Sequence, residues 1–171
     1  MLSFRPPIID GRLKIGAIYA ILFFRDPDPA EGFHWGIYHH LTTHGGYKYH
    51  LKNMGQNHWI QDFQSTGGVM KSIFLVGLMR IGYADPSQNQ NVYNIVNSVA
   101  ITAPPPGSDR STCRTWSMYV IYLLTTQGYV RCKNMAMLEE QITDWAKAHH
   151  ETSVMNVQPR PITDSTVCQL Y

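Results

Sequence analysis

An apolar run near the start of the chain limits the possible folds more than any other stretch. Residues 14–24, KIGAIYAILFF, combine aromatic and β-branched side chains with a single charge. Such a run is typical of a central strand that is buried on both faces. It is shorter than the roughly 20 apolar residues that span a bilayer. We therefore expect a sheet built around this strand, and no transmembrane segment.

Three further stretches are predicted to be strands of a meander, at residues 33–41, 47–52 and 59–65. Residues 71–83 supply one or two more strands. The first two are joined by a Gly-Gly loop and predict a hairpin, because glycine takes a positive φ at no steric cost. This hairpin carries His34 on one strand and His50 on the other. The pattern predicts an antiparallel meander.

Helical spacing of apolar residues appears in three later stretches: residues 88–101, 112–126 and 135–150. A stiff connector with three consecutive prolines leads into the second of them. We therefore predict an α+β fold in which an antiparallel sheet packs against helices, as one domain over residues 1–150. Residues 151–171 contain two prolines and no periodicity, which predicts an extended or disordered C-terminal tail.

Charge and cysteine content exclude some classes of function. Charged residues make up 15% of the chain and the net charge is +2, with no basic run to bind nucleic acid. The three cysteines, Cys113, Cys132 and Cys168, follow no metal-ligand spacing. An odd number of unpaired thiols favours a reducing compartment, so we expect a cytoplasmic protein.

Cys113 is the candidate nucleophile. With Ser111 or Thr112 as the N-cap, its thiol lies in the first turn of the second helix, beside free backbone N–H groups and the positive end of the helix dipole. That setting favours the thiolate, and the same N–H groups can hold an oxyanion. The alternative is that Cys113 is a small apolar side chain in the core.

His34 is the candidate general base, because imidazole exchanges protons near neutral pH. His50, on the neighbouring strand, can orient the His34 ring, although either histidine alone can be purely structural. A metal site at His39, His40 and His44 is not expected. Strand alternation sends the first two to opposite faces, and the third lies in the hairpin loop.

The order of these motifs resembles a known group of proteins. His-Trp-Gly-Ile-Tyr at 34–38, Tyr-His-Leu at 49–51 and a helix that opens with Cys113 are similar to the circularly permuted NlpC/P60 proteins, in particular their lecithin retinol acyltransferase-like branch. The family's Asn-Cys-Glu-His-Phe motif is replaced here by Thr-Cys-Arg-Thr-Trp at 112–116. The chain also resembles uncharacterised small fungal proteins.

The resemblance implies a permuted papain-like fold with Cys113 as nucleophile, His34 as base and His50 as orienting residue. We therefore expect a cysteine-dependent hydrolase or acyltransferase that passes through a thioester. Its substrate would be a small-molecule, lipid or peptide acyl compound, and no cofactor or metal is expected. The alternative is a non-catalytic binding or accessory protein of the same fold, which would act with a partner protein, for example in a biosynthetic pathway.

Overall fold

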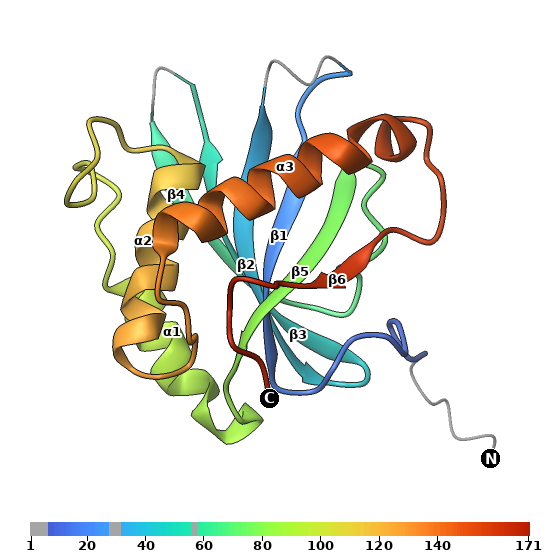
Figure 1. Cartoon of the computed structure of the whole chain (residues 1–171), viewed down its shortest axis with the longest axis horizontal. Coiled ribbons are helices and arrows are strands. Elements are labelled where there is room, and N and C mark those ends of the chain that lie inside the picture. The colour runs from blue at the N-terminus through green and yellow to red at the C-terminus, as the bar shows by residue number, and fades with distance from the viewer. Residues whose placement is uncertain (1–6, 28–31, 56–57) are drawn as a thin grey trace.

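A six-stranded sheet forms the centre of the molecule (Figure 1). The computed structural model describes residues 7–27, 32–55 and 58–171. The strands are β1 (Ala17–Phe24), β2 (Phe33–Thr42), β3 (Gly45–Asn53), β4 (Trp59–Thr66), β5 (Leu75–Tyr83) and β6 (Ile162–Asp164). Their order across the sheet is β4-β3-β2-β1-β5-β6, and the pairs are antiparallel except for β5 with β6.

Three α-helices cover one face of this sheet. They are α1 (Asn89–Asn97), α2 (Cys113–Thr126) and α3 (Met135–Val154), and the short 3-10 helix η2 (Pro86–Gln88) precedes α1. Helix α2 packs over β2 and β3, α3 crosses β1 and β5, and α1 lies against α2 (Figure 1). The predicted α+β class, with a mostly antiparallel sheet packed against helices, is confirmed.

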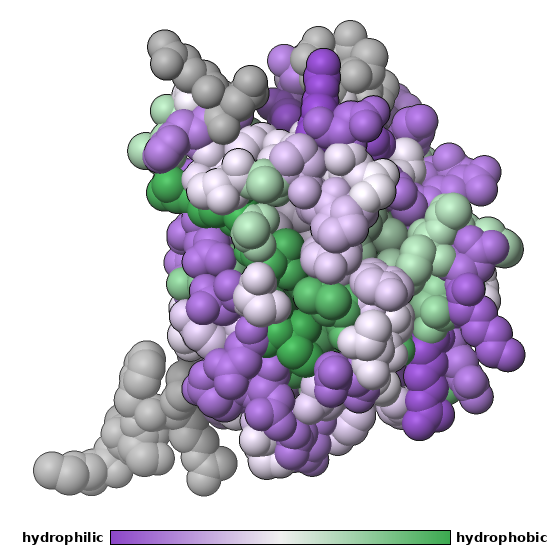
Figure 2. Space-filling view, turned by 90° about the vertical axis from the view of Figure 1, so that its left-hand side faces the viewer, coloured by the Kyte–Doolittle hydropathy of each residue, from purple (hydrophilic) through white to green (hydrophobic). Residues whose placement is uncertain are grey.

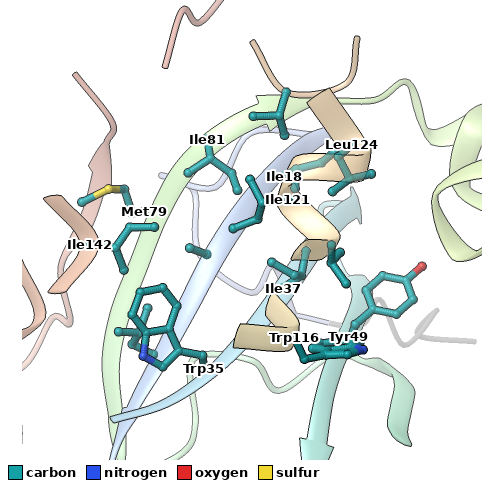
Figure 3. Packing of buried hydrophobic residues seen from close by; sticks show 14 of the residues in the cluster. Ile18, Trp35, Ile37, Tyr49, Met79, Ile81, Trp116, Ile121, Leu124 and Ile142 are labelled. Atoms are coloured by element: carbon teal, nitrogen blue, oxygen red, sulfur yellow. The ribbon is translucent and has the colours of Figure 1, made fainter. Parts of the chain in front are cut away.

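The first apolar run forms β1 as predicted, and both of its faces are buried. Ile18, Ala20 and Leu22 belong to the core under the helices, where residues from β2, β3, β5 and all three α-helices meet (Figure 3). The alternate residues Ala17, Tyr19 and Ile21 face a smaller core on the other side. We call these sides the helix face and the loop face, since the second is covered by segments around Leu13 and Val69.

The meander also follows the predicted strands. In the hairpin, β2 pairs with β3 from Thr42–Gly45 to Gly36–His50, and β4 continues along the far edge of β3. Gly46 is required in this hairpin, because a Cβ there would lie 2.5 Å from the backbone oxygen of His39 and from the Tyr38 ring. The first helix is shorter than predicted and ends at Asn97.

The C-terminal segment differs from the prediction of an extended or disordered tail over residues 151–171. Helix α3 continues to Val154, and β6 then joins the sheet beside β5. Between them, Arg160 is only 1% exposed and donates hydrogen bonds to the carbonyl oxygens of Leu75, Ile73 and Val157 at 2.7–3.0 Å. Individual buried side chains such as Arg160 anchor this segment in place of a repeating apolar face. Its sequence therefore shows no periodicity.

Candidate active site

A capping box fixes the start of α2. The Thr112 hydroxyl accepts a hydrogen bond from the Thr115 backbone N–H at 3.1 Å, and the Thr115 hydroxyl accepts one from the Thr112 N–H at 2.9 Å. Helix geometry leaves the amides of the next two residues, Cys113 and Arg114, without partners inside the helix. They are therefore the amides on hand to bind an anionic oxygen near the thiol.

The Cys113 thiol points from this helix start into the core on the helix face. Its side chain is 1% exposed. The Arg25 guanidinium, just beyond the end of β1, donates to Sγ from Nη2 at 3.0 Å. Sγ also lies 3.9 Å from the carbonyl oxygen of Phe33, at the start of β2. The sulfur thus rests between a cation and the backbone of the residue that precedes His34.

His34 and His50 meet on the loop face, where Asp62 extends their contact. His34 Nε2 lies 2.8 Å from His50 Nδ1, and His50 Nε2 lies 2.8 Å from Asp62 Oδ2. The second contact is short, but the ring N–H does not point squarely at the carboxylate, so it is better described as electrostatic than as an aligned hydrogen bond. We call these three side chains the histidine relay.

Gly36 makes room for this relay. It pairs with His50 across the hairpin, and a Cβ on Gly36 would lie 2.9 Å from the Tyr49 carbonyl oxygen and 3.1 Å from the His50 Cβ. His50 in turn pairs with Asp62 in the next strand, which places both on the same face. The pairing registers of β2, β3 and β4 therefore position the relay, and all three of its side chains come from strands.

Burial keeps the relay histidines neutral near pH 7. The pKa of His34 is lowered from 6.5 to about 4, first by desolvation and then by the nearby charges of His50, Arg25 and Lys48, while Asp62 acts in the opposite sense. The pKa of His50 is also lowered, mainly by burial and then by Lys48. Neutral imidazoles are the form that accepts protons.

The contacts also indicate which nitrogen is the base. If His50 directs its Nε2 proton toward Asp62, its Nδ1 must accept a hydrogen bond, and His34 Nε2 must donate it. The lone pair of His34 is then on Nδ1. The relay thus leaves one defined atom to take a proton.

The thiol and the relay approach β2 from opposite faces. Phe33 and Trp35 belong to the helix-face core with Cys113, while His34 packs against Phe23 on the loop face, with ring centroids 6.0 Å apart. Within the described residues, the Cys113 sulfur forms hydrogen bonds with Arg25 and the Phe33 carbonyl and none with His34. The structure brings His34 and His50 together, and in the part of the chain that it describes no hydrogen bond joins Cys113 to either of them.

Sequence reasoning did not identify Arg25 and Asp62 as site residues. The register between β3 and β4 would have revealed Asp62, because it puts the carboxylate opposite His50, but the connection after β3 gives no sequence signal for that register. Arg25 lies in a turn-forming Arg-Asp-Pro stretch that resembles an ordinary exposed loop. Its contact with Cys113 spans 88 positions and appears only in three dimensions.

Three other histidines form hydrogen bonds that support the fold. As predicted from alternation, His39 and His40 lie on opposite faces: His39 Nε2 is 2.8 Å from the Ala84 carbonyl, and His40 Nδ1 is 2.8 Å from the Tyr38 hydroxyl. His150, at the end of α3, bonds to the Asp26 carbonyl at 3.0 Å. Among the described residues, no three histidine, cysteine or acidic side chains gather as a metal site requires.

A surface groove lies on the other side of α2 from the thiol. Its volume is about 920 Å³, and it is bounded by the proline-rich connector, the outer side of α2 and the start of α3. Thr112 and Thr115 of the capping box line it, as do Tyr119 and Tyr122. Figure 2 shows the side of the molecule that carries α1, α2 and this connector, with an apolar area surrounded by hydrophilic side chains.

Across residues 7–27, 32–55 and 58–171, no helix has both the length and the hydropathy that crossing a bilayer requires. Comparisons of the chain with protein-family models, with curated proteins and with solved structures find no match.

Proposed function

We propose that this protein is a cysteine-dependent hydrolase or acyltransferase that acts on an acyl, amide or ester bond. The observation that carries the proposal is the half-buried line of contacts from Asp62 through His50 to His34. Burying two histidines with lowered pKa values costs folding free energy, and such clusters concentrate at functional sites. The arrangement also agrees with the resemblance to permuted NlpC/P60 proteins, which motivates a papain-like assignment of the fold.

In the proposed reaction, Cys113 is the nucleophile. His34 Nδ1 takes the thiol proton, and the sulfur bonds to the carbonyl carbon of the substrate. The resulting oxyanion is held by the amides at the start of α2. His34 returns the proton to the leaving amine or alcohol as the carbonyl re-forms, which yields a thioester. Water completes hydrolysis, whereas an amine or alcohol completes transfer.

Arg25 and the histidine relay act on different groups of the proposed site. The Arg25 guanidinium pairs with the sulfur, and His50 with Asp62 keeps the His34 proton on Nε2. Because the thiol rests against the Phe33 carbonyl, on the other face from the His34 ring, substrate entry displaces the sulfur from this resting position. The displaced sulfur then gives its proton to His34 Nδ1 at the start of β2. This strand has no β3 partner before Gly36.

An acyl-trapping experiment tests the proposal. The protein is incubated with p-nitrophenyl acetate, release of p-nitrophenolate is followed, and the acetylated residue is located by peptide mass spectrometry. We expect a burst and acetylation of Cys113. His34→Gln should slow acylation about 100-fold or more, because general-base catalysis is worth about 10²–10⁴.

Cys132→Ser is the matched control, because this thiol lies far along the chain and outside the relay. It should be acylated at Cys113 at the wild-type rate. Equal acylation rates in wild type and His34→Gln would overturn the catalytic role of the relay. Acylation of Cys132 in place of Cys113 would overturn the choice of nucleophile.

A non-catalytic binding protein is the second candidate, and the inaccessible thiol favours it. Cys113 is 1% exposed and faces away from the 920 Å³ groove. In that case the capped helix and the tyrosines of α2 serve the groove, and Cys113 only fills the core. This function predicts that the folded protein resists acylation of Cys113 and that the protein unfolded in guanidinium is acylated freely.

A further inference from the structure

The two cysteines outside the candidate site, Cys132 and Cys168, lie in adjacent backbone segments. Cys132 follows the end of α2, and Cys168 lies in the segment after β6. The Gln169 backbone N–H donates to the Arg131 carbonyl oxygen at 2.8 Å. Cys132 is the residue after Arg131, and Cys168 is the residue before Gln169.

The direction of these segments decides whether the two cysteines face each other. The Tyr171 hydroxyl donates to the Gly128 carbonyl at 3.3 Å, and the Arg131 guanidinium lies 4.0 Å over the Tyr171 ring. From Gln169 at Arg131 to Tyr171 at Gly128, the contacts run in the antiparallel sense across one backbone hydrogen bond. In an antiparallel pair, the neighbours of a bonded pair are directly opposed, with Cα atoms about 4.5–5.5 Å apart. That spacing is compatible with a disulfide.

The two thiols also interact directly and differ in exposure. Cys168 is buried, and burial together with the neighbouring Cys132 thiol raises its pKa to about 12. Cys132 is half-buried and donates weakly to the Asn134 carbonyl at 3.4 Å. An oxidant can therefore reach Cys132 first, and the buried Cys168 thiol lies next to it.

We propose that Cys132 and Cys168 form an intramolecular disulfide on exposure to a peroxide. The Cys132 sulfur attacks one peroxide oxygen, releasing water and leaving a sulfenic acid. The Cys168 sulfur then displaces the sulfenic oxygen, which leaves as a second water. Each sulfur loses one electron, the peroxide gains two, and both thiol protons end in water. This inference does not depend on the proposed function.

The bond would fasten the C-terminal segment to the connector between α2 and α3. It would close a loop that contains the whole of α3 and β6. A cross-link of this kind removes conformations from the unfolded chain. We expect it to raise the midpoint of thermal unfolding by about 5–10 °C.

The test is titration of the folded protein with hydrogen peroxide, followed by alkylation of free thiols and non-reducing peptide mapping. We expect the loss of two hydrogen atoms, one peptide pair joined through Cys132 and Cys168, and reversal by dithiothreitol together with the thermal shift. Cys113→Ser should form the same link. Cys132→Ser should form none and show no thermal shift.

Several results would overturn the proposal. These are complete oxidation of Cys132 to sulfinic acid without a link, links between separate chains only, or a link that involves Cys113. A Cys132–Cys168 link that forms only after unfolding in guanidinium would also overturn it, since the folded arrangement would then not be its source.

Discussion

The helix face and the loop face of the sheet are held together by different kinds of side chains. On the helix face, aliphatic and aromatic residues from β1, β2 and β5 pack against three helices (Figure 3). On the loop face, the apolar cluster is smaller, and the histidine relay lies beside it. The same strand, β2, supplies Trp35 to the first face and His34 to the second.

The two faces therefore contribute to the free energy of folding in different ways. Apolar burial on the helix face stabilises the fold without regard to pH. The half-buried relay on the loop face is favourable only while its histidines stay neutral, and it supplies the proposed general base. The predictions below test whether stability and chemistry are divided between the faces in this way.

The largest effect is expected on the helix face, from Trp116→Ala. Trp116 is fully buried and packs against Phe63, with ring centroids 5.9 Å apart. Removing the indole should lower the free energy of unfolding by about 3–5 kcal/mol in a denaturant titration. Tyr122→Ala, on the same helix but 47% exposed, should change it by less than about 0.5 kcal/mol. Similar losses for both variants would contradict the division.

On the loop face, stability should depend on pH through His34. In the unfolded chain this histidine binds a proton near pH 6.5, but in the folded protein it does so only near pH 4. The unfolded state therefore binds more protons in this window, so stability is complete above pH 6.5 and falls as the pH drops toward 4. The contribution of His34 is about 3 kcal/mol.

Denaturant titrations from pH 7 to pH 4 measure this loss. His34→Gln should lose less stability over the window than wild type, because one titrating group is gone. Gln61→Ala, an exposed neighbour of Asp62, should follow the wild-type curve. Parallel curves for wild type and His34→Gln would show that burial of His34 does not control the acid response.

Gly36→Ala tests how closely β2 and β3 must approach to form the relay. The added Cβ would meet the Tyr49 carbonyl and the His50 Cβ, so the strands must separate. We expect a loss of about 2 kcal/mol and faster reaction of His50 with diethyl pyrocarbonate. In contrast, a Cβ on Gly11 meets nothing within 4 Å, so Gly11→Ala should leave both measurements unchanged.

The smallest effect is expected at the junction of the site and the helix face. Thr112→Ala removes half of the capping box and should cost about 1 kcal/mol. Because the first turn of α2 then opens more often, alkylation of Cys113 by iodoacetamide should accelerate. Thr126→Ala, at the other end of α2, serves as the control for helix stability. An unchanged alkylation rate in Thr112→Ala would mean that the cap does not guard the thiol.

Much of the fold could be predicted from the sequence because its strands and helices carry local periodicity. The run at residues 14–24, the alternation around His34 and the cap before Cys113 each depend on neighbours in the chain. The pairing of His34 with His50 was also accessible, because a short Gly-rich loop joins their strands. In contrast, Arg25 at Cys113 and Asp62 at His50 depend on long-range register, which local patterns do not encode.

The face on which each candidate residue lies was harder to predict. Helical spacing in α2 places Cys113 on the side toward the sheet, and strand alternation places His34 and Trp35 on different faces. Neither pattern states which of the two strand faces the helix covers. The large apolar side chains Trp35 and Ile37 lie on the helix face, because burying them against α2 removes the most apolar area from water.

The contacts of Arg160 have a consequence for how the chain is completed during synthesis. Its guanidinium binds the Leu75 carbonyl, 85 positions earlier in the chain, and β6 then pairs with β5. Until these residues leave the ribosome, β5 has an open edge, although the rest of the sheet can already form. An open edge of this kind invites pairing with other chains. The nascent protein should therefore be most prone to aggregation after β5 and before β6 has been synthesised, and slowing the synthesis of residues 84–159 should increase its need for chaperones.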